Sequence, residues 1–245
     1  DPNFEQALID LGYDTAPIDG SVLTANISGV TNLDVRNKNI SDLTGIEDFT
    51  ALTDLECGFN QLTSLDTSNN TELETLFCFN NQLTSLDFSN NPNLIILFCY
   101  TNQLTSLDVS QNTALIALHC GNNQLTSLDF SNNPNLIYLE CQINQLTNLD
   151  LSNQEELEKL YCYSNQLQSL DLRNNPLTGF FSDPYFPGNE AHFNASNNPD
   201  LGCILVDDVS YATAFLTNKD YTATFVNDEA ECDAIALSAL WTLDP

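Results

Sequence analysis

Three sets of side chains in this sequence have types and spacings that could do chemistry. Cysteines and aspartates each recur at intervals of 21 residues, and lines of thiolates or carboxylates could hold metal ions. The third set is two histidines, His119 and His192, the residue type used most often as a general acid or base. The two lines are Cys57, Cys78, Cys99, Cys120, Cys141 and Cys162, and Asp66, Asp87, Asp108, Asp129, Asp150 and Asp171.

No catalytic motif accompanies these residues. The sequence lacks G-x-S-x-G, H-E-x-x-H and a glycine-rich phosphate loop, and neither histidine stands in a credible nucleophile context. Carboxylate pairs are common in a chain with 34 acidic residues, so their proximity alone does not indicate a glycosidase. We therefore expect a protein that is not an enzyme and that carries no cofactor.

The composition excludes several classes of partner. The chain has 245 residues, 34 acidic against 5 basic, and a net charge of −29. Nucleic acids and anionic membranes both require a basic surface, so neither is an expected partner. The sequence contains no methionine and begins without a basic and apolar leader, so we expect a processed chain whose signal peptide has been removed.

An internal repeat must position the candidate side chains. The string L-x-x-L-x-C-x-x-N-Q-L begins at Leu52 and returns every 21 residues, so that six copies cover residues 52–177. Each copy contains a second, shorter version of itself that begins ten residues later, as at Leu62. No single unit can bury its leucines alone, so the copies must stack.

The repeat resembles the leucine-rich-repeat family, whose signature is LxxLxLxxN. Its nested form of ten plus eleven residues looks like the bacterial subclass called IRREKO-type. The resemblance implies a leucine-rich-repeat solenoid of short parallel strands, mostly β and loops with little helix, and with caps at both ends. Residues 3–12 and 198–208 also resemble the opening and closing segments of secreted Bacteroidetes proteins of this family, whose mature chains are exported.

The ends of the solenoid should be capped. Residues 1–30 are expected to form an N-terminal cap with a helix over residues 2–11, N-capped by Asp1 and stopped by Gly12. Residues 31–51 look like a divergent first repeat, and residues 178–245 like a repeat remnant and a C-terminal cap. We expect the repeat to break down at residues 179–184, a partial strand at residues 191–197, and a disulfide between Cys203 and Cys232.

The repeated cysteines and asparagines have structural interpretations. Neighbouring cysteines should lie about 4.8 Å apart with parallel side chains, which suits neither a disulfide nor tetrahedral zinc, so we expect six buried free thiols. Two lines of amides should satisfy the backbone at the solenoid corners. They are Asn60, Asn81, Asn102, Asn123, Asn144 and Asn165, and Asn70, Asn91, Asn112, Asn133, Gln154 and Asn175.

The outward positions of the first strand in each repeat vary, whereas the scaffold does not. They bring together aromatic and polar side chains that we expect to be exposed and to bind a ligand. The candidates are Phe77, Phe79, Phe98, Tyr100, His119, Tyr138, Glu140, Tyr161 and Tyr163. The alternative is that these rings only stack across strands and stabilise the sheet.

The second strand of each repeat is expected to present a regular Ser-Asp-Ser face. Its aspartates should accept hydrogen bonds from nearby serines or turn amides, and a weak calcium site is the functional alternative. The preferred hypothesis is a secreted or cell-surface module that binds a protein through the aromatic face. The alternative is polysaccharide binding by the same face, and the third is calcium binding or a spacer role for the Ser-Asp-Ser face.

Overall fold

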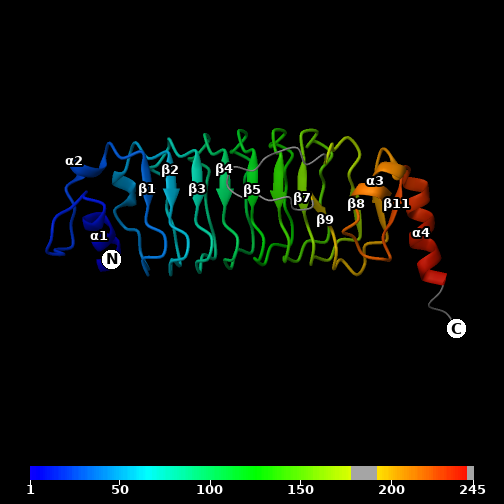
Figure 1. The fold of residues 1–245 in the computed structure, drawn as a ribbon, viewed down its shortest axis with the longest axis horizontal. Helices are drawn as coiled ribbons and strands as arrows, with labels where there is room; N and C mark the ends of the chain where they lie inside the picture. Colours follow the sequence, from blue (N-terminus) through cyan, green and yellow to red (C-terminus); the bar gives the residue numbers. More distant parts are fainter. Residues whose placement is uncertain (178–191, 242–245) are drawn as a thin grey trace.

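The protein is a straight, elongated solenoid with helices at both ends (Figure 1). The computed structural model describes residues 1–177 and 192–241, with side chains up to residue 235. The predicted solenoid of parallel strands with little helix is confirmed. None of the helices in the described residues has the length and apolar character needed to cross a membrane.

A parallel sheet of eight strands runs along the rod in the order β1-β2-β3-β4-β5-β6-β7-β9. The first strand of every repeat enters this sheet, and neighbouring repeats pair in register, as Leu55 with Leu76 and Leu76 with Leu97. The strands are β1 Asn32–Asp34, β2 Asp54–Glu56, β3 Thr75–Phe77, β4 Ile96–Phe98, β5 Ala117–His119, β6 Tyr138–Glu140, β7 Lys159–Tyr161 and β9 Phe193–Asn194.

The prediction of a second strand in every repeat is wrong. Only the sixth copy forms one, β8 (Ser169–Asp171), which pairs with β10 (Cys203–Leu205) in a three-stranded sheet that β11 (Thr224–Val226) completes. In the other copies, side chains satisfy amides of this segment: Asn81 Oδ1 accepts from Leu62 N at 3.0 Å, and Asp66 Oδ1 from Ser68 N at 2.9 Å. The segment therefore keeps its shape without a ladder.

Both ends of the rod are covered. Helix α1 (Pro2–Asp10) begins as predicted, with the Asp1 side chain accepting from the amides of Asn3 and Phe4, and the short helix α2 (Thr24–Ile27) follows. A 3-10 turn, η1 (Ile46–Asp48), precedes β2. At the other end α3 (Val209–Phe215) packs on β11, and α4 (Glu229–Trp241) packs on β10 and β11. The predicted break at residues 179–184 lies outside the described residues.

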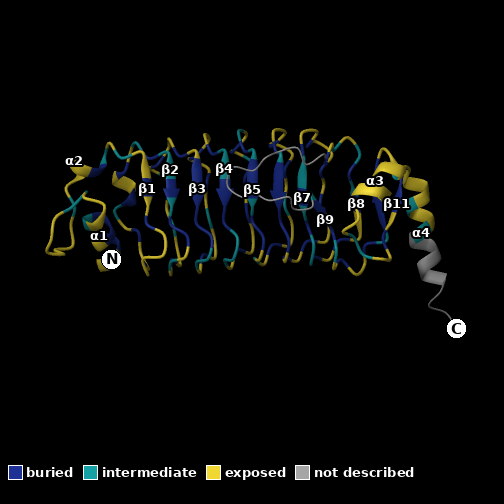
Figure 2. Ribbon diagram, in the orientation of Figure 1, coloured by how far each residue is buried: buried dark blue, intermediate teal, exposed yellow. Residues whose placement is uncertain are grey.

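The expected disulfide is present and joins the last helix to the second sheet. Cys203 on β10 is bonded to Cys232 on α4, with their Cα atoms 5.6 Å apart. The six repeated cysteines are free and buried, as predicted. They lie with the leucines in the core that runs the length of the rod, shown dark blue in Figure 2.

The first amide ladder supports the turn after each strand. Asn123 Nδ2 donates to the carbonyls of Cys99 and Cys120 at 3.2 and 3.0 Å, and its Oδ1 accepts from Leu104 N at 3.0 Å. The second ladder only donates in most copies: Asn112 Nδ2 bonds two carbonyls, whereas its buried Oδ1 has no partner. The expectation that both ladders satisfy donor and acceptor holds for the first ladder alone.

This asymmetry predicts unequal stability losses. Asn123→Ala leaves the buried Leu104 amide without an acceptor, which costs about 1–3 kcal/mol. Asn112→Ala is the matched control, because the carbonyls it releases, those of Phe88 and Asn91, keep backbone amide donors. We expect the larger fall in melting temperature for Asn123→Ala. Equal losses in calorimetry would contradict this account of the two ladders.

The thiol column makes a second prediction. Burial raises the pKa of Cys57, Cys99 and Cys162 to about 12, and the thiolate is the reactive form. The folded protein should therefore not react with Ellman's reagent at pH 8, whereas in denaturant without reductant six thiols should react. Rapid labelling of the folded protein would show that the column opens to solvent.

Candidate functional site: the outward face of the long sheet

In-register pairing of neighbouring strands stacks the outward side chains on one another. We call this outward side of the eight-stranded sheet the strand face. The rings of Phe77 and Phe98 are 4.8 Å apart and 11° from parallel, and those of Phe79 and Tyr100 are 4.6 Å and 3°. The row continues from Tyr100 to His119, whose ring lies 4.1 Å away. The rings thus cover one another's faces.

The expectation that these aromatic residues are exposed is wrong for the centre of the face. Phe98 and Tyr138 are each 2% exposed, and Phe77, Phe79 and Glu140 are also buried. Tyr138 belongs with the phenylalanines in one apolar cluster, so the sequence-based grouping of Tyr138 with Tyr161 and Tyr163 is wrong. Stacking between neighbours in register removes these rings from solvent. Tyr100, His119, Tyr161 and Tyr163 are partly exposed.

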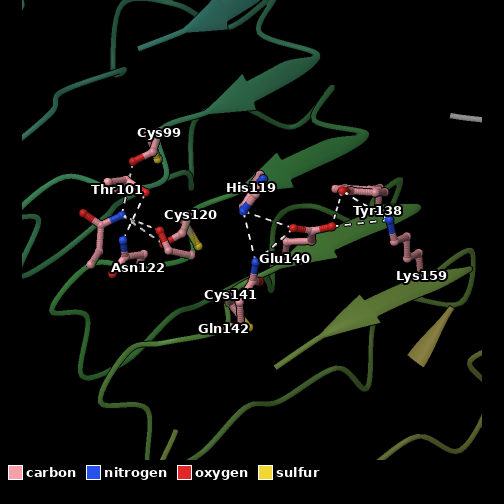
Figure 3. Close-up of polar contacts among 12 residues, drawn as sticks. Cys99, Thr101, His119, Cys120, Asn122, Tyr138, Glu140, Cys141, Gln142 and Lys159 are labelled. Atoms are coloured by element: carbon pink, nitrogen blue, oxygen red, sulfur yellow. Dashed lines mark hydrogen bonds and ion pairs between the residues drawn. The ribbon is translucent and has the colours of Figure 1, made fainter. Parts of the chain in front are cut away.

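Glu140 is the centre of a polar network at the C-terminal end of this row (Figure 3). Its carboxylate accepts hydrogen bonds from the Tyr138 hydroxyl and, at 3.0 Å, from Gln142 Nε2. Lys159 Nζ lies 3.3 Å from Glu140 Oε1, and the two side chains are 13% and 8% exposed. The ammonium group also lies 4.6 Å from the ring centres of Tyr138 and Tyr161.

His119 joins this network as a neutral ring. Burial lowers the pKa of His119 to about 4, and the nearby Glu140 carboxylate only partly opposes this effect. His119 Nε2 lies 3.0 Å from Glu140 Oε2, so the neutral tautomer that pairs with this carboxylate carries its proton on Nε2 and donates it to Glu140. Gln142 Nε2 lies 3.1 Å from the same ring atom, and in this tautomer that approach is a contact between two donors. His119 Nδ1 is then an acceptor, and it is buried without a partner, as is Gln142 Oε1.

A cavity of about 260 Å³ lies among these side chains, and we call it the Glu140 cavity. Gly121 allows the Gln142 side chain to lean across to His119, since a Cβ at Gly121 would lie 2.8 Å from Gln142 Cδ. The lining residues are His119, Tyr138, Glu140, Gln142, Lys159, Tyr161 and Tyr163. Sequence reasoning placed five of these among the candidate residues but missed Lys159, because a repeat pattern does not show which neighbours complete a network.

Two exposed apolar side chains border the strand face and were also missed. The third residue after each strand of the long sheet lies in the left-handed region, with φ from 52° to 57°. Apart from glycine, asparagine tolerates this conformation best, but Phe59 and Ile143 occupy it and are 54% and 44% exposed. The other members are Asn37, Asn80, Thr101, Asn122, Ser164 and Asn197. The signal in the sequence was the departure from asparagine in this column.

The aspartate column stabilises its own turns, as the structural interpretation expected. Asp66, Asp87, Asp108, Asp129 and Asp150 each accept from the amide of the serine two residues on, at 2.9 to 3.0 Å. The same contacts lower the pKa of the first four carboxyls. Asp171 pairs instead with Arg173. Within the described residues, no group of His, Cys, Asp and Glu side chains is arranged to hold a metal ion.

Comparison with known proteins places the fold. No protein-family model matches the chain. The structure is similar to that of internalin C2 from Listeria monocytogenes, with a TM-score of 0.65 and 22% identity over 92% of this chain and 93% of that one. The chain has the leucine-rich-repeat fold.

Two further similarities cover parts of this leucine-rich-repeat chain. A segment of 45 residues, 18% of the chain, is 49% identical to internalin J from Listeria monocytogenes and spans only 5% of that relative. The ectodomain of the receptor kinase GASSHO1/SCHENGEN3 from Arabidopsis thaliana, solved in complex with CASPARIAN STRIP INTEGRITY FACTOR 2, has a TM-score of 0.53 and 26% identity. That match covers 58% of this chain and 19% of the ectodomain.

The neutral histidine predicts a specific pH dependence. Between pH 6.5 and about 4, His119 is protonated in the unfolded chain but stays neutral in the folded protein. The free energy of unfolding therefore falls as the pH decreases through this range. The loss is roughly 3 kcal/mol at most, at about 1.4 kcal/mol per pKa unit. His119→Gln should reduce this slope in urea unfolding between pH 4 and 7. Identical slopes for the two proteins would contradict the assignment.

Proposed function

We propose that this chain is a non-enzymatic recognition module that binds a protein partner through the strand face. The scaffold of leucines, cysteines and asparagines is nearly constant, whereas the outward side chains change from repeat to repeat. A constant frame with variable outward positions suits recognition. In the described residues, the polar side-chain atoms next to His119 Nε2 belong to Glu140 and Gln142, so the His119 ring lies in a polar network and not against a nucleophile.

The main support for this proposal comes from Phe59 and Ile143. A bulky or β-branched residue in the left-handed region costs about 1–2 kcal/mol relative to a residue suited to it. Both side chains also expose apolar surface at the edge of the strand face. Strain and exposure together reduce stability and solubility, and contact with a partner gives a reason to keep them, because apolar anchors supply most of the binding energy at protein interfaces.

The relatives and the charge support a protein partner in the extracellular space. The plant ectodomain was solved with a bound partner, and internalin C2 has the same fold. The net charge of −29 favours a partner with a basic or neutral contact surface and disfavours nucleic acid and anionic membrane. Export also fits the disulfide between Cys203 and Cys232, since such bonds persist in oxidising compartments.

The finer assignments from sequence remain part of this proposal. The nested 21-residue period supports the IRREKO-type subclass and the resemblance to secreted Bacteroidetes proteins. The proposed division is a cap over residues 1–30, a divergent repeat over 31–51, six repeats over 52–177 and a C-terminal remnant and cap over 178–245. A calcium role for the aspartates is disfavoured, because turn amides already occupy one oxygen of most of these carboxylates.

The test uses a phage-displayed library of extracellular protein domains. The wild-type protein should bind at least one domain, and Phe59→Asn with Ile143→Asn should weaken that binding at least tenfold. The double variant should melt close to wild type, because asparagine relieves the left-handed strain at both positions and this gain offsets the lost contact between the Phe59 and Phe79 rings, whose centres are 5.2 Å apart.

The matched control is Ser85→Asn with Ser127→Asn, in the exposed Ser-Asp-Ser segments away from the strand face. These changes should leave binding within twofold of wild type. The proposal fails if the captured domains bind the Phe59 and Ile143 variant as tightly as wild type, or if no domain is captured.

A further inference from the structure

We propose that the Glu140 cavity binds one uncharged, polyhydroxylated ring, that is, a neutral sugar residue. The sugar could come from a glycan on a partner protein or from a free polysaccharide, and its chemistry is the same in both. This inference rests on the proposed recognition role of the strand face and names what the C-terminal part of that face contacts.

The charges of the cavity favour an uncharged ligand. The Glu140 carboxylate and the Lys159 ammonium lie 3.3 Å apart and are both nearly buried, so their charges offset each other. His119 adds no charge, because it is neutral above about pH 4. An anion would meet Glu140 and a cation would meet Lys159, and each would also lose its water shell. A neutral ligand avoids both penalties.

The unpaired polar atoms favour a ligand with several hydrogen-bond donors. His119 Nδ1 and Gln142 Oε1 are buried acceptors without partners, and an unpaired buried acceptor destabilises the folded protein. The terminal torsion of glutamine is soft, so the Gln142 amide can turn to present Oε1 to a ligand while a ligand hydroxyl replaces Nε2 at Glu140. Sugar hydroxyls donate and accept, which meets both requirements.

The aromatic wall and the volume favour a single ring. Tyr161 and Tyr163 line the cavity with ring centres 6.4 Å apart and planes 55° apart, unlike the parallel pair of Phe79 and Tyr100. Such rings give the apolar face of a sugar a surface to pack on. A volume of about 260 Å³ lies just below the roughly 300–1,000 Å³ of sites for drug-sized ligands, so one sugar residue fits better than an enclosed chain.

The experiment is native affinity electrophoresis in gels that contain amylose, curdlan, galactomannan or yeast mannan. A parallel arm measures binding to immobilised asialofetuin before and after enzymatic removal of its glycans. Wild type should be retarded by at least one polysaccharide, or should bind asialofetuin only while its glycans are present. The first result identifies a free polysaccharide as a source of the sugar and the second a glycoprotein.

The key variant is Gln142→Leu, which keeps the side-chain size and removes the amide that contacts His119 and Glu140. It should weaken sugar binding at least tenfold, with folding checked by its melting temperature. Tyr163→Ala should also weaken binding and keeps the proposal testable if Gln142→Leu does not fold. Ser85→Asn, in an exposed Ser-Asp-Ser segment and not among the cavity residues, should bind sugar within twofold of wild type.

No binding in either arm, or binding that Gln142→Leu and Tyr163→Ala leave unchanged, would overturn the sugar site. Such a failure is distinct from a failure of the proposed function. A protein that captures displayed domains through Phe59 and Ile143 but binds no sugar refutes only the sugar site. A protein that binds sugar but captures no domain refutes only the protein-binding role.

Discussion

The structure depends on the in-register stacking of identical turns at the strand spacing of about 4.8 Å. One turn cannot bury Leu52, Leu55 and Cys57 by itself, so each turn is folded only because the next one covers it. The same constraint repeats every side chain as a column along the rod. Buried leucines, buried thiols and the asparagines that bond the corners are therefore all consequences of one pairing rule.

Stacking also explains why the strand face is less exposed than alternation along a strand would suggest. A ring that points outward from β3 has a ring on β4 directly beside it, and the two cover each other. A charged residue in such a column is enclosed in the same way. Glu140 lies between His119 on the preceding strand and Lys159 on the following strand, so its carboxylate is nearly buried although it points away from the core.

The residues that depart from the repeat pattern lower the stability of the solenoid and also form the proposed binding sites. The left-handed turn suits asparagine, yet Phe59 and Ile143 stand there. The Glu140 cavity is likewise lined by a carboxylate, an ammonium group and an amide where neighbouring turns carry stacked aromatic rings. A regular solenoid makes such departures visible, because every other turn shows what the scaffold alone requires. The proposed contacts with a protein and with a sugar both rest on departures of this kind.

The sequence by itself determined the solenoid, the buried thiols, the helix that follows Asp1 and the disulfide of the C-terminal cap. These features follow from a period of 21 residues and from local rules, which act between near neighbours and can be counted along the chain. The sequence did not determine whether the second segment of each repeat would form a β-strand that pairs with its neighbours. That depends on whether backbone amides bond a neighbouring strand or a side chain, and only β8 next to β10 forms a ladder.

Tertiary structure alone also decided the candidate site. The sequence placed His119 and Glu140 on neighbouring strands. It did not show that Gln142 would lean over Gly121 to reach them, or that Lys159 would offset the charge of Glu140. Tertiary structure also decided how exposed the outward aromatic side chains are, because their exposure depends on how closely the rings on adjacent strands approach. Side-chain directions and burial come from packing among several turns at once, and a pattern of residue types along one chain does not contain that information.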